Sequence, residues 1–286
     1  MTVIDTFMVN DEFDLLECRL ATMSPAVDYF VAVEADVDHQ NHPKPYRLSE
    51  NLDRFAPWKD KLIVVKATNL PTTPHEDDPW AREWAQRDWT WVGLAEIPGL
   101  SDDAIILHGD VDEICDPLYV RNVRPRFKEF VQFEQRLHCF AIDWLHPDPW
   151  GGTVAVTLAT VKALGERQYV GDEMYHPGPW QLVRNQRNGL QHRNFDYLGT
   201  GWRTSVLPAS GWHFSWLGGK EAAERKLGSF CHPEVADRIK AGLGSDLFLV
   251  EGWHVDGRRM MPVDVDDSYP QWIVDGNAPS EWYRPR

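Results

Sequence analysis

Three carboxylates within four residues form the densest group of potential metal ligands in the sequence. Asp110, Asp112 and Glu113 follow Ile105–Leu107, an apolar run typical of a buried strand. Ligands of open α/β sheets bind beyond the carboxyl ends of the strands, which is where these acids stand. Crowded carboxylates repel one another unless a cation neutralises them, and their oxygens suit Mg²⁺ or Mn²⁺. The pattern therefore predicts a divalent metal site, with a turn cap and solvated acids as the alternative.

A histidine in a short aromatic segment could complete such a site. His213 lies in Gly211–Trp216, which predicts a strand, and a neutral imidazole is a good third ligand. The alternative is a histidine that is simply hydrogen-bonded in the core. The sequence has no HExxH zinc motif, no GxSxG elbow, no Walker loop and no GxGxxG turn in a suitable context. These absences weigh against hydrolases, P-loop enzymes and dinucleotide-dependent dehydrogenases.

The first 115 residues alternate predicted strands and helices, the pattern of a parallel sheet covered on both faces. Helices are expected from Asn10 or Asp11 to Pro25, and from Asp78, with proline at the first helical position, through Ala95. The strands are expected at Val3–Val9, Tyr29–Val33, Leu62–Val65 and Ala104–Leu107.

The pattern loosens after residue 115. Strands are predicted at Phe130–Phe133, Thr153–Thr160, Trp180–Val183 and Gly211–Phe214, and helices at Glu221–Phe230 and Glu234–Leu243. No repeat or linker divides the chain. We therefore expect one domain over residues 1–286, made of a half at 1–115, a more irregular half at 116–260 and a tail at 261–286.

Composition excludes several classes of protein. With 43% hydrophobic and 12% aromatic residues, the 286-residue chain has enough apolar surface for a globular core. Its formal charge of −15 opposes non-specific binding to nucleic acid or to an anionic membrane. No apolar run approaches the roughly 18 residues of a membrane span, and the N-terminus lacks signal-peptide character, so a soluble, cytoplasmic protein is expected. The four cysteines are far apart and predict reduced, buried thiols.

Several segments, taken in order, resemble glycosyltransferase family 17. The similarity runs in patches over roughly residues 3–235. It is carried by residues 5–20, 27–34, Lys44-Pro45, 86–88, 110–114, 211–216 and 226–234. Two departures occur: Cys115 replaces an expected proline, and Asp88 an expected asparagine. The resemblance associates the eukaryotic members with a membrane anchor and the secretory pathway, whereas no such segment is expected here, so their glycoprotein acceptor is not assumed for this chain.

The resemblance implies an α/β fold of GT-A type: a mostly parallel, Rossmann-like sheet with helices on both faces and an irregular acceptor-binding second half. Residues 1–115 then bind the nucleotide sugar, and residues 116–260 bind acceptor and metal. It also implies an inverting enzyme that uses Mn²⁺ or Mg²⁺ to move a sugar, expected to be N-acetylglucosamine from a UDP donor, to a hydroxyl of a glycan or glycoconjugate.

Roles for individual residues follow from the same resemblance. Asp112 is expected to hold the metal, with Asp110 on the ribose or at the metal and His213 completing the ligands. The donor-binding residues are expected to include Asn10, Glu12, Glu34, Lys44, Arg87, Asp88 and Asp110. Arg87 and Lys44 are assigned to the diphosphate. Surface or helix-dipole charges are the alternative interpretation of these residues.

An inverting transfer also needs a base to accept the proton of the attacking hydroxyl. Glu173 is expected in this role, with Asp172 as its rival, although either could instead cap a helix. Trp faces stack on sugars, so an acceptor platform is expected from Trp144, Trp150, Trp180 and Trp212. Two alternatives remain open: an acceptor that is a phage or bacterial glycan or protein or a modified nucleobase, and a non-catalytic carbohydrate-binding protein with structural Ca²⁺.

Overall fold

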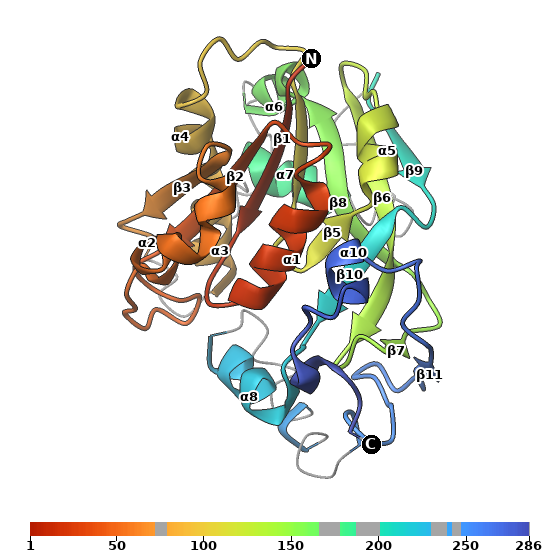
Figure 1. The fold of residues 1–286 in the computed structure, drawn as a ribbon. Coiled ribbons are helices and arrows are strands. Elements are labelled where there is room, and N and C mark those ends of the chain that lie inside the picture. The colour runs from red at the N-terminus through yellow and green to blue at the C-terminus, as the bar shows by residue number, and fades with distance from the viewer. Residues whose placement is uncertain (72–78, 166–177, 187–200, 230–238, 242–246, 286) are drawn as a thin grey trace.

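The strands of the protein form one curled sheet. The computed structural model describes residues 1–71, 79–165, 178–186, 201–229, 239–241 and 247–285. The strands are β1 (Val3–Met8), β2 (Tyr29–Ala35), β3 (Leu62–Ala67), β4 (Ile105–Asp110), β5 (Glu113–Cys115), β6 (Glu129–Cys139), β7 (Trp144–Leu145), β8 (Trp150–Thr157), β9 (Arg203–Leu207), β10 (Gly211–Ser215) and β11 (Met261–Pro262). The main path of the sheet runs β11-β7-β6-β8-β4-β1-β2-β3 (Figure 1).

Short helices connect these strands. They are α1 (Phe13–Met23), α2 (Arg47–Glu50), the 3-10 helix η1 (Leu52–Trp58), α3 (Pro79–Asp88), α4 (Thr90–Ala95), α5 (Pro117–Asn122), α6 (Leu158–Gly165), α7 (Pro179–Asn185), α8 (Gly219–Ser229), α10 (Gln271–Val274) and the 3-10 helix η4 (Ser280–Trp282). Within the described residues, no helix is both long and apolar enough to cross a membrane.

Strands β3, β2, β1 and β4 are parallel, as their Val- and Ile-rich sequences predict. In this register Met8, the last residue of β1, lies beside both Val33 and Asp110. The turn after β1 and the acids after β4 therefore meet at one edge of the sheet. This edge is where a ligand of an open α/β sheet binds.

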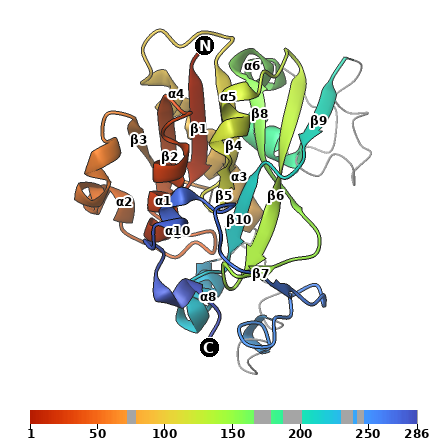
Figure 2. The same cartoon turned by 45° about the vertical axis from the view of Figure 1, so that its right-hand side comes forward.

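The second half of the chain extends the sheet in mixed directions. Strand β8 is antiparallel to both β4 and β6, while β9 and β10 run parallel to β6 along its other edge (Figure 2). The expected α/β fold is confirmed, with its alternating first half and irregular second half. The sheet as a whole is mixed, so the parallel arrangement is limited mainly to the first four strands.

Both faces of the central strands are buried, because neighbouring residues alternate between two hydrophobic cores. Phe7 and Leu107 pack on one face with α1, α5 and α10. Ile4 and Ile106 pack on the other face with α4, α6 and α7. A third core lies between α8 and residues 239–241 and 247–260, at the end of the molecule toward which β1 runs (Figures 1 and 2). The described cysteines, Cys18, Cys115 and Cys139, are buried and free, as expected.

Four local predictions differ from the structure. The strand expected at Thr153–Thr160 ends at Thr157, and Leu158 begins helix α6. Trp180–Val183 is part of helix α7, not a strand: a short apolar run does not distinguish the two, and Pro179 suits the first turn of a helix. The helix expected up to Ala95 is interrupted at Trp89, and Gly93 of the second piece packs directly on Val31. The N-cap of α1 is Glu12, without a side-chain cap, rather than Asn10 or Asp11.

Candidate active site

A pocket of about 330 Å³ opens at the carboxyl ends of β1 and β4. Its lining includes seven of the residues that were expected to bind the donor or the metal: Asn10, Glu12, Lys44, Arg87, Asp110, Asp112 and His213. The remaining wall comes from segments distant in sequence, including Trp80, Trp150, Trp216, Lys226 and His254. Fold topology therefore gathers these side chains around one space.

Asp112 and His213 stand together on this wall. Strand β10 is antiparallel to β5, with His213 beside Glu113, and the Phe214 amide donates to the Asp112 carbonyl at 2.9 Å. This pairing brings His213 Nε2 to 3.4 Å from a carboxylate oxygen of Asp112. Sequence spacing alone does not show the contact, because 101 residues separate the two.

Lys226 of α8 binds the same carboxylate, with its Nζ 3.2 Å from Asp112. Burial disfavours the ionised form of Asp112, but the positive charge of Lys226 and the contact with His213 outweigh it. They hold the pKa of Asp112 well below its usual range. Asp112 is therefore an anion throughout the neutral pH range, as a metal ligand must be.

Asp110 faces guanidinium groups instead. Arg87 of α3 donates to one of its carboxylate oxygens at 2.8 Å, and Arg184 of α7 donates to the other. Burial opposes the charge of Arg87, but Asp110 and Glu83 more than compensate and raise the pKa of Arg87 above its usual value. Asp110 thus links two buried arginines at the edge of the pocket.

Glu113 anchors the turn from beneath. Its fully buried carboxylate accepts hydrogen bonds from Arg184 at 2.6 and 2.7 Å and from Trp150 Nε1 at 2.9 Å. A Cβ at position 109 would lie 2.4 Å from Thr153 Oγ1 and 2.9 Å from Glu113. Gly109 therefore makes room for the side chains of Thr153 and Glu113.

Arg19, which sequence reasoning missed, holds the backbone of the same turn. It is fully buried on α1 and pairs with Asp5 through contacts of 2.6 and 2.7 Å. Its guanidinium also donates to the carbonyl oxygens of Asp110 at 2.8 Å and Glu113 at 2.6 Å. The available signal was an arginine between two residues of the apolar face of α1, Cys18 and Leu20.

The polar groups of the pocket that are buried without a hydrogen-bond partner among the described residues include Asn10 Oδ1 and Lys44 Nζ. Burial lowers the pKa of Lys44, partly offset by Glu34. A buried polar group without a partner is costly, and a polar ligand would satisfy both groups. Glu12 is engaged locally, since it accepts the amides of Asn10 at 3.1 Å and Asp11 at 3.2 Å.

Two other expected donor-binding residues do not line the pocket. Glu34 is buried at the end of β2 and accepts the amides of Leu48 at 2.9 Å and Ser49 at 3.0 Å, which caps α2. Asp88 packs against Gly178 and the Trp180 amide at the start of α7. Burial raises the pKa of Asp88 to about 6.

The expected base and acceptor platform have different outcomes. Glu173 and Asp172 lie outside the described residues. Trp150 lines the pocket, and its ring centroid lies 4.8 Å from that of His213. Trp180 is fully buried against Trp91 and His108 and offers no face to a ligand. Trp144 and Trp212 are also buried, at 6% exposure each.

The chain is similar in sequence to known glycosyltransferases. Residues 1–156 match the family model of glycosyltransferase family 17. Over 235 residues the chain is 26% identical to the human and the rat β-1,4-mannosyl-glycoprotein 4-β-N-acetylglucosaminyltransferases. The match covers 79% of this chain but 42% of those relatives.

Among solved structures, glucosyl-3-phosphoglycerate synthase from Mycobacterium tuberculosis, in complex with Mn²⁺, UDP and phosphoglyceric acid, aligns with a TM-score of 0.38 and 16% identity. The alignment covers 96% of this chain and 91% of that one.

Proposed function

The chain belongs to glycosyltransferase family 17, and we propose that its pocket binds a nucleotide-sugar donor together with a divalent metal ion. The proposed reaction moves a sugar, N-acetylglucosamine from UDP, to a hydroxyl of a glycan or glycoconjugate with inversion at the anomeric carbon. The names of the two mammalian relatives support N-acetylglucosamine as the transferred sugar.

The charge of the pocket carries the proposal. Three cations, Lys44, Arg87 and Lys226, face five carboxylates in its lining, which leaves a formal charge of −2 with histidines neutral. The five carboxylates are those of Glu12, Asp38, Glu83, Asp110 and Asp112. A diphosphate of charge about −2 would be repelled by this lining, because like charges at short range raise the energy steeply. A divalent cation bound with the donor removes that repulsion.

The donor atoms of the pocket fit such a cation. Asp112 and His213 offer a carboxylate oxygen and an imidazole nitrogen, both accepted by Mn²⁺. We assign these two residues as protein ligands. Asp110 is the third proposed ligand. An incoming diphosphate would compete with Asp110 for Arg87 and Arg184, and a carboxylate released from these arginines could then bind the metal ion. When bound, the metal supplies Lewis-acid stabilisation of the departing diphosphate.

The other residues of the pocket act directly on the donor in this proposal. Lys44 and Arg87 bind the diphosphate, Asn10 and Glu12 hold the base or the ribose, and Trp150 offers a flat face to a sugar. Glu34 and Asp88 support the pocket from behind, through α2 and α7. Glu173, with Asp172 as its rival, remains the proposed base.

A donor-hydrolysis and transfer assay tests the proposal. Protein treated with EDTA is supplied with a panel of nucleotide sugars, with and without Mn²⁺, and nucleotide release is measured. We expect Asp112→Asn to lower turnover at least ~10²-fold, because a charged ligand becomes neutral. Asp102→Asn, an exposed aspartate paired with Lys162, is the matched control and should retain full activity.

Three outcomes would contradict parts of the proposal. Full transfer without a divalent ion would exclude the role of the metal. Retention of the anomeric configuration, followed by proton NMR, would exclude inversion and the base. Binding of glycans without any release of nucleotide would favour a non-catalytic carbohydrate-binding protein.

A further inference from the structure

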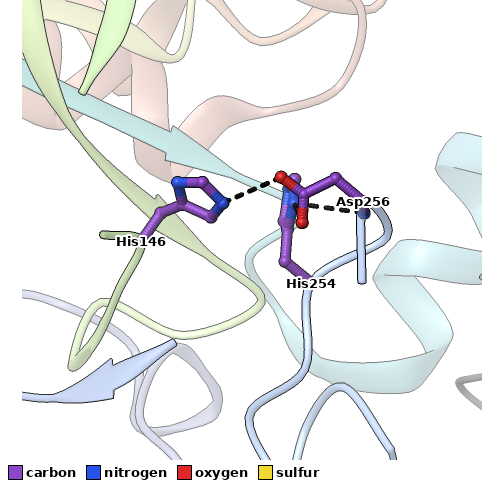
Figure 3. Close-up of side chains that lie close together, drawn as sticks. All are labelled: His146, His254 and Asp256. Carbon is purple, nitrogen blue, oxygen red and sulfur yellow. Dashed lines mark hydrogen bonds and ion pairs between the residues drawn. The ribbon is translucent and has the colours of Figure 1, made fainter. Parts of the chain in front are cut away.

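Two histidines and one aspartate form a compact cluster beside the pocket. His146 follows β7, whereas His254 and Asp256 lie in the turn of the hairpin at residues 252–260 (Figure 3). His146 Nε2 lies 3.1 Å from one carboxylate oxygen of Asp256, and His254 Nδ1 lies 2.9 Å from the other. One ligand atom from each residue lies within 4.8 Å of the other two.

These separations are close to those of a metal site. Tetrahedral Zn²⁺ with bonds of about 2.0 Å places neighbouring ligand atoms roughly 3.3 Å apart. The two contacts, which end on different oxygens of Asp256, are within a few tenths of an ångström of that value, and all three ligand atoms lie within 4.8 Å of one another. Small side-chain rotations suffice to converge the three groups on one ion, with a fourth position left for water.

The surrounding hydrogen bonds support ligation by nitrogen. His146 Nδ1 lies 3.0 Å from the carbonyl oxygen of Asp148 and 3.1 Å from the Asp148 amide nitrogen. In the tautomer whose Nδ1–H donates to that carbonyl, Nε2 carries the lone pair that a metal ion needs. Histidine ligands of metals typically donate their other ring nitrogen to a carbonyl in this way. Asp256 is itself oriented by the Arg258 amide, which donates at 2.9 Å.

The donor set favours an ion of the Zn²⁺ type. Two of the three ligands are imidazoles, which suit Zn²⁺ and bind Mg²⁺ poorly. Arg258 lies near the carboxylate, with its Nε 3.7 Å from Asp256, and pairs with Asp148. The positive charge of Arg258 opposes any cation at Asp256. An ion such as Mg²⁺, which would be held mainly by the carboxylate, is therefore disfavoured more than Zn²⁺, which also bonds to the two imidazoles.

We propose that His146, His254 and Asp256 bind a divalent transition ion of the Zn²⁺ type that fixes the 252–260 hairpin to the connection between β7 and β8. The site uses neither Asp112 nor His213. Because His254 and Val255 line the pocket, the ion holds one of its walls in place. The inference goes beyond the proposed transfer reaction and holds whether or not that reaction occurs.

Zinc titration of the whole chain tests the site. The protein is treated with EDTA, dialysed, and titrated with ZnCl₂ by calorimetry in an Asp112→Asn background, so that the metal ligand proposed for the donor is already neutral. We expect one equivalent of tightly bound zinc, at least 10²-fold tighter than Mg²⁺. Zinc at about a hundred times its dissociation constant should raise the Tm by about 5 to 10 °C.

Variants locate the ion. His254→Asn and Asp256→Asn should each lose this equivalent and the rise in Tm. His42→Asn is the matched control, since His42 also pairs with an aspartate, Asp38, but is 66% exposed and belongs to no such cluster among the described residues. Asp256 is 39% exposed, so its variant is expected to fold even if that of His254 does not.

A second readout is local. Arg258 and Arg259 are exposed in the hairpin, and zinc should slow tryptic cleavage after them without slowing cleavage elsewhere. Unchanged zinc binding in folded Asp256→Asn would overturn the proposal, as would no binding tighter than that of Mg²⁺. Zinc that is bound by wild type but lost on Asp112→Asn alone would assign the ion to the pocket pair, which overturns this site and leaves the proposed function standing.

Discussion

The buried pair of Arg19 and Asp5 offers a test that separates the stability of the protein from the geometry of the turn that carries Asp110 and Asp112. Arg19→Met removes the cation beside a carboxylate that has no exposed surface. It also removes the donors that bind the carbonyl oxygens of Asp110 and Glu113. Asp5→Leu combined with Arg19→Met removes the stranded charge but does not restore those donors.

The two effects have different sizes. Breaking a buried ion pair by removing one partner costs about 3–5 kcal/mol, whereas replacing both partners by apolar residues is often nearly neutral. A buried carbonyl left without its donor costs about 1–3 kcal/mol. We therefore expect Arg19→Met to lower the free energy of unfolding by at least about 3 kcal/mol, or the Tm by roughly 6–20 °C. The double variant should recover about 2 kcal/mol of that loss.

Activity should not recover with stability. The turn that carries Asp110 and Asp112 remains unsupported in the double variant, and a displacement of about 1 Å at a reacting centre can lower a rate by 10²-fold. Urea unfolding measures stability, and Mn²⁺ affinity together with nucleotide release measures the site. Arg54→Met is the control, because Arg54 of η1 forms solvent-accessible ion pairs with Asp14 and Glu17 of α1, and such pairs contribute about 1 kcal/mol or less.

The reasoning would be refuted by either of two results. A double variant as unstable as Arg19→Met would show that the stranded carboxylate is not the source of the loss. A double variant that regains both stability and metal affinity would show that Arg19 does not position the turn.

Three further predictions concern the pocket and its support. His213→Ala should weaken Mn²⁺ binding in calorimetry while leaving the melting curve nearly unchanged; loss of folding would instead favour a core histidine. Lys44→Met should raise the KM for the donor at least ~10-fold without lowering the Tm, because its buried ammonium has no hydrogen-bond partner among the described residues; a lower Tm at unchanged KM would contradict its role. The raised pKa of Asp88 means that the folded state binds this proton more tightly than the unfolded state does. The stability that this proton contributes is therefore complete below about pH 4, where the acid is protonated in both states, and is lost as pH rises through about 6, the pKa in the folded state. Asp88→Asn should therefore stabilise the protein at pH 7 and flatten this part of the pH profile in urea unfolding, and equal profiles would refute the assignment.

The first half of the fold was predictable because its signals are local. Strands rich in Val and Ile that alternate with helices indicate a parallel, doubly covered sheet, and β1, β2, β3 and β4 form as expected. The second half was less predictable, since its strands are held by partners distant in sequence. Trp180–Val183 illustrates this: four residues carry too little periodicity to distinguish a strand from the helix that packs on β4 and β8.

The candidate site likewise contains residues that were predictable from the sequence and residues that were not. Asp110 and Asp112 were identifiable because a strand end followed by crowded acids is a feature of contiguous sequence. The partners of these acids were not identifiable, since Arg19, Arg184 and Lys226 come from three helices that look like ordinary solvent-facing or amphipathic segments. The cluster of His146, His254 and Asp256 was not predictable for the same reason, because 108 residues separate His146 from His254 in the sequence.

The sequence by itself determined which groups are available for chemistry, namely the acids at 110 and 112 and the imidazole of His213. It also determined the order of strands and helices in the first half, because these features depend on side chains that are close together along the chain. The tertiary structure alone decided how those groups are charged and held. It paired Asp112 with Lys226 and His213, gave Asp110 to two arginines, and turned Glu34 and Asp88 away from the pocket. The physical reason is that electrostatic energy depends on the distance between charges in space and on their removal from water, and neither quantity is written in the spacing along a chain.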